Sequence, residues 1–299
     1  MQAPTVLRTA VLGSGLLGLD LVERMQLSAY LSCDLVVGRT SHSPGLKQAA
    51  ELGCATAAGG VAALLESGQS FDVVFDATNA FEHPEHWGRL AGSGTVLIDL
   101  TPTRGGALIV PTVNGDQAAQ YQHISLVSCG GQAAIPVLYA LAHHYRPQYV
   151  EMVATAASAS VGRASRLNLD EYVETTQGAI GEFTQAPTAK AMLNISAATP
   201  PPPFRIAMTL VAPGAEQGPV NDIVETAAAH MRTLVPGYHV TACTVTGDTV
   251  RVIAEVSATR GRMPIHAGNL EVISAAAIYA AEQHAHATSP AQALKELAR

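Results

Sequence analysis

A glycine-rich motif near the N-terminus constrains the fold more than any other feature of this chain. Gly13-Ser14-Gly15-Leu16-Leu17-Gly18 has the spacing G-x-G-x-x-G and lies between an apolar run, residues 7–12, and a helical pattern, residues 19–25. In this setting the first glycine permits a tight turn, the second lets the backbone approach a pyrophosphate, and the third lets the helix pack closely on the strand. The motif therefore predicts a dinucleotide-binding domain in which residues 13 to 18 contact the phosphates at a helix N-terminus.

The pattern that follows the motif indicates a parallel sheet. Short apolar runs at residues 34–37, 71–75, 96–98 and 125–128 alternate with helical stretches over the first 130 residues. Such alternation is typical of an α/β fold, a doubly wound Rossmann sheet whose ligands bind at the carboxyl ends of the strands. We expect residues 1–130 to form this domain.

The residues after the second and third strands bear on the choice of cofactor. Arg39 stands where many NAD-binding folds carry an acid for the ribose hydroxyls, and it is followed by Thr40 and Ser41. An arginine beside hydroxyls can accept the 2′-phosphate of NADP, or it can stack on adenine, so NAD and NADP both remain open. Thr78 lies in a small polar turn after the third strand, which commonly borders the nicotinamide half of the cofactor.

Cys129 ends the apolar run that begins at Ser125 and is followed by two glycines and by a helical pattern from about Pro136. At the mouth of a sheet, the free N–H groups of the next helix favour thiolate over thiol, which would make Cys129 a nucleophile. The alternative is a structural cysteine, because cysteine is among the most buried residue types. The carboxyl-edge position, on the side where the nicotinamide is expected, favours the nucleophile.

Composition excludes several classes of function. Only 14% of the 299 residues are charged and the net charge is −7, so we expect neither nucleic acid nor a membrane surface as a partner. The four cysteines form no C-x-x-C pair, which predicts free thiols, no zinc site and a cytoplasmic location. His83 and His86 have the spacing of metal ligands, but Pro84 lies between them, and we interpret them as part of a solvated loop with no metal.

The second half of the chain predicts a different kind of domain. Strand-like runs at residues 149–158, 190–195, 204–211, 238–245 and 250–256 indicate an α+β catalytic and dimerisation domain, residues 131–268, built on an antiparallel sheet. An open sheet of this kind often buries one face in a second subunit, which predicts a homodimer. The segment 269–299 contains an apolar helix, which we expect to return to the first domain.

Taken together, these motifs resemble those of the acylating acetaldehyde dehydrogenases, and the resemblance covers nearly the whole chain. It is carried by the following segments: Gly13–Gly18, Asp76-Ala77-Thr78, Ile98-Asp99-Leu100-Thr101-Pro102, Ser128-Cys129-Gly130-Gly131-Gln132, Arg166-x-Asn168-x-Asp170-Glu171-Tyr172, Val235-Pro236-Gly237-Tyr238 and Ala267-Gly268-Asn269-Leu270.

The resemblance implies an enzyme that converts a short aldehyde, NAD and coenzyme A to acyl-CoA and NADH, with Cys129 as the nucleophile that forms a thiohemiacetal and then a thioester. It also implies cofactor-side roles for Ser160, Gly162, Asn168 and Asn269, although a helix cap is an alternative role for either asparagine. Members of the family commonly pair with a 4-hydroxy-2-oxoacid aldolase, so such a complex is a further expectation.

Departures from the family pattern cluster in the second domain. Ile206 stands where the family usually has an acid, and His266 replaces a usual aromatic residue. We hypothesise that His266 partly replaces the missing acid in proton transfer. Two other functions stay open: a dehydrogenase or reductase for another acyl donor, such as an acyl phosphate, and an NAD-binding subunit that scaffolds or gates an aldolase without its own chemistry.

Overall fold

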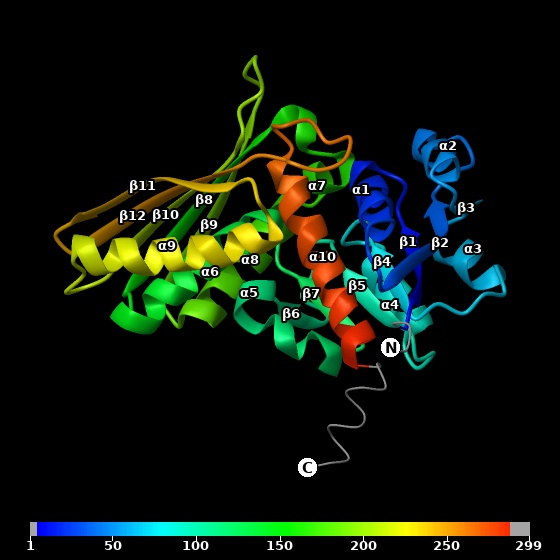
Figure 1. Ribbon diagram of the computed structural model, residues 1–299, viewed down its shortest axis with the longest axis horizontal. Coiled ribbons are helices and arrows are strands. Elements are labelled where there is room, and N and C mark those ends of the chain that lie inside the picture. The colour runs from blue at the N-terminus through cyan, green and yellow to red at the C-terminus, as the bar shows by residue number, and fades with distance from the viewer. Residues whose placement is uncertain (1–4, 288–299) are drawn as a thin grey trace, which may run out of the picture. The chain divides into compact units, whose positions relative to one another are not determined.

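The structure, a computed structural model, describes residues 5–287 and divides them into two compact units (Figure 1). The first unit contains the chain up to residue 126 and the segment from residue 276, and the second contains residues 127–275. The sequence placed the first boundary after residue 130. The part of the expected C-terminal segment beyond residue 287 lies outside the described residues.

The first unit is built on a seven-stranded sheet with the strand order β3-β2-β1-β4-β5-β7-β6, in which every pairing is parallel. Its strands are β1 (Leu7–Leu12), β2 (Leu31–Gly38), β3 (Ala55–Ala58), β4 (Val73–Asp76), β5 (Val96–Asp99), β6 (Ala107–Ile109) and β7 (His123–Leu126). Its helices are α1 (Leu16–Met25), α2 (Pro44–Glu51), α3 (Val61–Glu66), α4 (His83–Leu90), α5 (Pro111–Asn114) and the short 3-10 helix η1 (Gly115–Gln120). The doubly wound Rossmann sheet is confirmed, and its order reverses beside β1, where such sheets bind ligands.

The central strands explain why the sheet forms here. Strands β4 and β5 are buried along their whole length, as expected for parallel strands covered on both faces. Leu12, Val74 and Leu97 belong to one core cluster, so the apolar runs that predicted the strands also form the interior of the unit.

The second unit is built on a five-stranded sheet with the order β11-β12-β10-β8-β9. Its strands are β8 (Tyr149–Ala157), β9 (Thr188–Ser196), β10 (Phe204–Val211), β11 (Tyr238–Thr246) and β12 (Thr249–Val256). Its helices are α6 (Cys129–Tyr145), α7 (Arg163–Leu167), α8 (Leu169–Thr184) and α9 (Gln217–Leu234), with the 3-10 helix η2 (Ser158–Ser160). The expectation of an antiparallel sheet is wrong for one pair: β8 and β9 run parallel, because helix α8 forms a crossover connection between them.

One face of this second sheet is buried and the other is only partly covered. Along β10, Phe204, Ile206, Met208 and Leu210 are buried, whereas the residues between them are exposed or intermediate. Helices α6, α8 and α9 lie along the sheet in Figure 1. Ile206 therefore points into the core between sheet and helices.

Helix α10 (Gly268–Ala287) begins in the second unit and ends in the first. In the first unit its residue Glu282 accepts a hydrogen bond of 2.7 Å from Ser28, and His286 lies against the ring of Tyr30 with the centroids 4.4 Å apart. The predicted return of a C-terminal helix to the first domain is thus confirmed.

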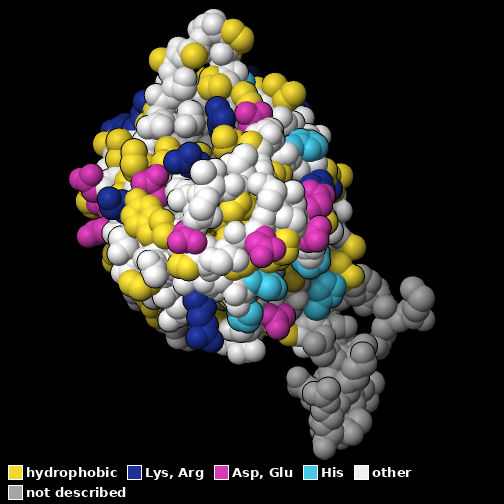
Figure 2. Space-filling model, turned by 90° about the vertical axis from the view of Figure 1, so that its left-hand side faces the viewer, with side chains coloured by type: hydrophobic (Ala, Val, Ile, Leu, Met, Phe, Trp, Pro, Cys, Tyr) yellow, Lys and Arg dark blue, Asp and Glu magenta, His cyan; other side chains and the backbone are white. Residues whose placement is uncertain are grey.

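Two surface properties bear on partners. Within residues 5–287, no helix combines the length and the apolar character that a bilayer crossing requires. The face shown in Figure 2 mixes basic, acidic, hydrophobic and histidine side chains, and basic residues form no broad area on that face. That face therefore lacks the positive field that gathers a phosphate backbone.

Candidate functional site

The glycine-rich loop has the geometry that dinucleotide binding requires. Gly13 has a φ of +113°, and a Cβ at this position would lie 2.5 Å from the carbonyl oxygen of Ala77. A Cβ on Gly18 would lie 2.0 Å from the carbonyl oxygen of Gly13, so α1 packs this closely only with glycine at position 18. A Cβ on Gly15 would meet no atom within 4 Å, so the N-terminus of α1 is open to a pyrophosphate. The loop fits a dinucleotide.

The other residues predicted on the cofactor side of the first unit lie around this loop. Leu16 is exposed and Leu17 partly exposed in the first turn of α1, and Arg39 is exposed directly after β2. A Cβ on Gly38 would lie 3.1 Å from the Oγ of Ser14, so the end of β2 borders the loop. Thr78 follows β4 and is fixed by hydrogen bonds from its backbone N–H and its hydroxyl to Asp76, at 3.1 and 2.5 Å.

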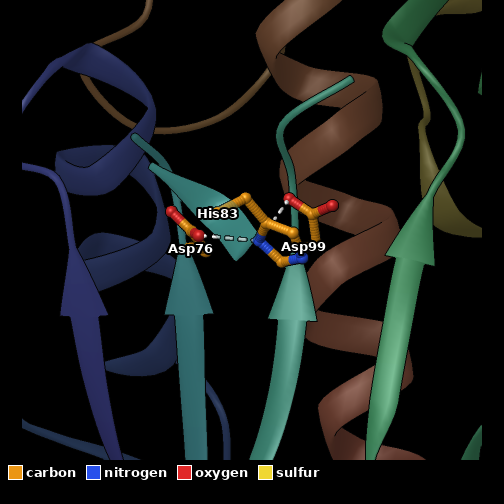
Figure 3. Close-up of side chains that lie close together, drawn as sticks. All are labelled: Asp76, His83 and Asp99. Atoms are coloured by element: carbon orange, nitrogen blue, oxygen red, sulfur yellow. Dashed lines mark hydrogen bonds and ion pairs between the residues drawn. The ribbon is translucent and has the colours of Figure 1, made fainter. Parts of the chain in front are cut away.

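Beneath the loops that follow β4 and β5 lies a buried cluster of acids and histidines that the sequence did not predict (Figure 3). Asp76 and Asp99 end neighbouring strands, pair in register and are both fully buried. The ring of His83 lies between them, with Nδ1 2.8 Å from Asp76 Oδ2 and 3.4 Å from Asp99 Oδ1. The Nδ1 of His86 lies 2.7 Å from the same oxygen of Asp76, and the Nε2 of His83 lies 2.9 Å from the Nε2 of His123.

The interpretation of His83 and His86 as a solvated loop is wrong, because both lie in helix α4 and are only 2% and 3% exposed. Pro84 occupies the first turn of α4, where a missing N–H costs nothing, so it starts the helix and does not prevent it. The proline was therefore a signal for a helix N-terminus.

Electrostatics in this cluster favour an ion pair. Despite burial, the hydrogen bonds of His83 and His86 hold the pKa of Asp76 below its ordinary value of 3.8, whereas burial raises the pKa of Asp99 to about 6. The pKa of His83 is raised: burial disfavours its charge, but the hydrogen bond to Asp76 and the charge of Asp99 outweigh burial. Burial and the positive charge of His83 lower the pKa of His123 to about 4. His83 is thus the cation between two carboxylates.

Ligand atoms of Asp76, His83 and Asp99 lie within 4.8 Å of one another, so this donor set has the spacing to surround a metal ion. Two ligands of a tetrahedral zinc ion are about 3.3 Å apart, given bonds of about 2.0 Å. The distance of 2.8 Å between His83 and Asp76 is shorter than that and equals a hydrogen bond. The contact between His83 and Asp76 is therefore a hydrogen bond.

In the second unit, Cys129 is the first residue of α6, seven residues earlier than the sequence indicated. Ser128 caps this helix by accepting a hydrogen bond of 3.1 Å from the N–H of Gly131. A Cβ on Gly131 would lie 2.2 Å from Val127, and a Cβ on Gly130 would lie 2.4 Å from the hydroxyl of Tyr172. The two glycines thus allow the close packing that places Cys129 at the helix N-terminus.

The helix N-terminus favours thiolate at Cys129, as the sequence predicts, but burial of the thiol opposes this effect more strongly. Burial raises the pKa of Cys129 from 9.0 to about 11, and this outweighs the opposing effects of Tyr172 and of the backbone N–H groups of Cys129 and Gly130. The surroundings are apolar: Ala154 and Met152 border Gly130, and Ile206 pairs with Ala154 on the neighbouring strand. The residue as a whole is nevertheless partly exposed.

The remaining predicted residues lie in the second unit. The structure brings together Asn269 and Ser160, whose carbonyl accepts a hydrogen bond of 3.1 Å from the side chain of Asn269. The Oδ1 of Asn269 is buried with no hydrogen-bond partner among the described residues. Asn168 is fully buried between α7 and α8, and its side chain does not cap α8.

Gly162 is exposed and directly precedes α7. His266 is partly exposed in the segment before α10, and the groups that shift the pKa of Cys129 do not include it. Tyr172 is a residue that the sequence did not assign a role; it was visible only as part of the segment after Asn168, 43 residues from Cys129.

Comparisons with known proteins agree with this arrangement. Residues 129–264 match the family model described as prokaryotic acetaldehyde dehydrogenase, dimerisation. Acetaldehyde dehydrogenase of Streptomyces griseus is 46% identical over 92% of this chain and 89% of its own length. Acetaldehyde dehydrogenase 2 of Salinispora arenicola is 38% identical over 93% of this chain and 96% of its own length.

A solved structure shows the fold alone: aspartate semialdehyde dehydrogenase II of Vibrio cholerae has a TM-score of 0.64 at 13% identity, with 95% of this chain and 100% of that chain covered. The relatives at 46% and 38% identity, each matched over more than nine-tenths of this chain, show the family itself. This chain belongs to the acetaldehyde dehydrogenase family and is an aldehyde dehydrogenase of that type.

Proposed function

We propose that this protein oxidises a short aliphatic aldehyde, acetaldehyde or propanal, with NAD and coenzyme A to give acyl-CoA and NADH. The observation that carries the proposal is the position of Cys129: a partly exposed cysteine that is the first residue of a 17-residue helix, with its thiol beside the backbone N–H groups of Cys129 and Gly130. This is the arrangement that an acyl-forming cysteine needs. The named relatives support acetaldehyde as the substrate.

Cys129 would act as the nucleophile. Its sulfur forms a bond to the carbonyl carbon of the aldehyde, and the electron pair of the C=O bond moves to the oxygen. The N–H groups at the start of α6 point toward this region and stabilise the negative charge that develops there. The apolar surroundings of Met152 and Ala154 limit the access of water to the thioester.

The glycine-rich loop would hold the pyrophosphate of the cofactor, with Thr78 at the end of β4 on the nicotinamide side. A bound nicotinamide supplies the hydride acceptor. Arg39, exposed at the end of β2, makes NADP an alternative to NAD. The family resemblance also assigns cofactor-side roles to Ser160, Gly162, Asn168 and Asn269 in the second unit. The buried Oδ1 of Asn269, which has no hydrogen-bond partner among the described residues, supports a role in accepting an N–H of a ligand.

The proton of Cys129 needs an acceptor, and we propose His266 for this role in place of the acid that Ile206 replaces. Ile206 is fully buried and cannot take a proton, whereas His266 is partly exposed. A His266→Phe variant should lose coenzyme A-dependent turnover at neutral pH. Turnover equal to that of the wild type across pH 6 to 9 would contradict the role.

NADH formation from acetaldehyde and coenzyme A tests the function directly. Cys129→Ala should abolish it, and Cys243→Ala, which removes a partly exposed thiol on β11, should leave it intact. Equal rates for wild type and Cys129→Ala would refute the nucleophile. Activity that requires phosphate in place of coenzyme A would instead identify an acyl-phosphate enzyme.

We also propose that the protein forms a homodimer, because residues 129–264 match the dimerisation region of the family. Light scattering at micromolar concentration should give twice the mass of 31.0 kDa, and a mass equal to one chain would contradict the dimer. A complex with a 4-hydroxy-2-oxoacid aldolase remains a proposal from the family resemblance. NAD binding without any NADH formation by the wild type would favour a scaffold for such a partner.

A further inference from the structure

The hydroxyl of Tyr172 is a buried polar group in the second unit without a well-formed hydrogen bond to any described residue. The residue is 6% exposed, and its Oη forms no hydrogen bond of good geometry with any described residue. A Cβ added to Gly130 would lie 2.4 Å from this oxygen, so the hydroxyl lies over the first turn of α6. A buried hydroxyl without a partner is costly, and such groups are often retained for function.

The neighbouring hydroxyl protons are already used. Thr176 donates its proton to the carbonyl of Tyr172 at 2.5 Å, so in its contact of 2.6 Å with Ser128 the serine must be the donor. Ser128 also accepts the N–H of Gly131. Ser128 and Thr176 therefore have no proton left for the thiol of Cys129.

The two strands that border this turn contribute apolar side chains. Strand β8 contributes the apolar side chains of Met152 and Ala154, each 3.1 Å from a Cβ built on Gly130, and β10 contributes Ile206 beside Ala154. Tyr172 is the side chain that stabilises the charged form of Cys129, together with the two backbone N–H groups. No Asp, Glu, Lys, Arg or His of the described residues adds to these effects on the thiol.

We propose that Tyr172 is a catalytic residue whose hydroxyl donates a hydrogen bond to the sulfur of Cys129 when the thiolate forms. This inference rests on the proposed role of Cys129 as the nucleophile. In the resting protein the hydroxyl of Tyr172 lies near two weak acceptors, the Oγ of Ser128 and the neutral thiol of Cys129. Once the sulfur is charged it becomes the stronger acceptor, because hydrogen bonds to ionised groups are about twice as strong as neutral ones.

The hydroxyl keeps its own proton throughout. Burial and the neighbouring charge of Cys129 raise the pKa of Tyr172 well above 10, so the group is a donor and not an acid that releases its proton. No bond is made or broken at Tyr172; the proton of Cys129 leaves to a base, and the hydroxyl stabilises the charge that remains.

The test compares Tyr172→Phe with Tyr238→Phe. Tyr238 is also a buried tyrosine, and its hydroxyl donates a hydrogen bond of 3.0 Å to the carbonyl of Ala133, one turn further along the same helix. Both variants lose one buried hydroxyl beside α6, but only Tyr172→Phe removes the donor to the sulfur. The readouts are the rate of alkylation of the Cys129 peptide by iodoacetamide against pH, and the turnover number for NADH formation.

Tyr172→Phe should slow alkylation about tenfold at pH 8 to 9 and shift its profile up by about one pH unit, as expected for losing a hydrogen bond to a charged group. Turnover should fall by a similar factor, and Tyr238→Phe should change neither profile nor turnover. A wild-type profile for Tyr172→Phe, or an equal shift in both variants, would overturn the inference. Full NADH formation by Cys129→Ala would refute the proposed function instead. In that case the alkylation profiles of the wild type and of Tyr172→Phe would still test the hydrogen bond to the sulfur.

Discussion

Replacing His83 by alanine tests whether the buried cluster in the first unit is an ion pair on which the sheet depends. In the wild type, the ring of His83 lies between two fully buried carboxylates and contacts Asp76 at 2.8 Å, Asp99 at 3.4 Å and His123 at 2.9 Å. The variant leaves both acids in the interior without this cation. Removing one partner of a buried ion pair costs about 3–5 kcal/mol, because the remaining charge is uncompensated.

The chain provides its own probe for this measurement. Trp87 is its single tryptophan, lies in α4 and stacks on His123 with the ring centroids 4.2 Å apart. Tryptophan fluorescence during urea unfolding therefore reports on the cluster. With a slope of about 1–3 kcal/mol per molar urea, the expected loss moves the midpoint down by roughly 1–5 M. His42→Ala, at an exposed position of the same unit, is the control and should change stability by less than about 0.5 kcal/mol.

The pKa shifts predict how the stability lost in His83→Ala changes with pH. The pKa of His83 is raised in the folded protein, so its stabilisation is complete below its ordinary value of 6.5 and is lost as pH rises through the folded value. The pKa of Asp76 is lowered, so its stabilisation is present above 3.8 and is lost in acid. The difference between wild type and variant should be large at pH 6.5 and smaller at pH 9. A cost under about 1 kcal/mol, or one that grows from pH 6.5 to pH 9, would refute the ion pair.

Three further predictions concern the two proposed binding regions. Alkylation of Cys129 in the free enzyme should rise about tenfold per pH unit up to pH 10, because its pKa is about 11; a plateau below pH 9 on peptide mass spectrometry would contradict this. Gly18→Ala should abolish NAD binding in calorimetry, since its Cβ would lie 2.0 Å from the carbonyl oxygen of Gly13; retained affinity would show that the loop tolerates a side chain. If Arg39 recognises a 2′-phosphate, Arg39→Ala should weaken NADP about tenfold or more while sparing NAD; equal initial-rate KM changes for both cofactors would favour adenine stacking instead.

The parts of the fold that short-range patterns encode were predictable from the sequence. The strand, turn and helix start around Gly13 to Gly18 are predictable because they follow one another within twenty residues. Strand β3 was missed because its sequence, Ala55–Ala58, is rich in alanine, a weak strand former. The start of α6 at Cys129 was missed because glycines and Pro136 disfavour a helix locally, whereas tertiary packing requires the glycines.

The polar contacts of the candidate sites could not be predicted, because they join residues far apart in the chain. Asp76 and Asp99 meet only when β4 and β5 pair in register. Tyr172 reaches Cys129 from helix α8 of the second unit, and nothing in its local pattern distinguishes it from a core tyrosine. The raised pKa of Cys129 has the same origin, since burial by distant segments outweighs the local effect of the helix N-terminus.

The central claim is that Cys129 carries the acyl group, and the acyl-enzyme itself tests it most directly. Protein incubated with acetaldehyde and NAD in the absence of coenzyme A should show an acetyl group on the peptide that contains Cys129, measured by mass spectrometry after an acid quench. Addition of coenzyme A should remove that group and release acetyl-CoA. NADH formed with an unmodified Cys129, or an acetyl group that persists when coenzyme A is added, would contradict the account.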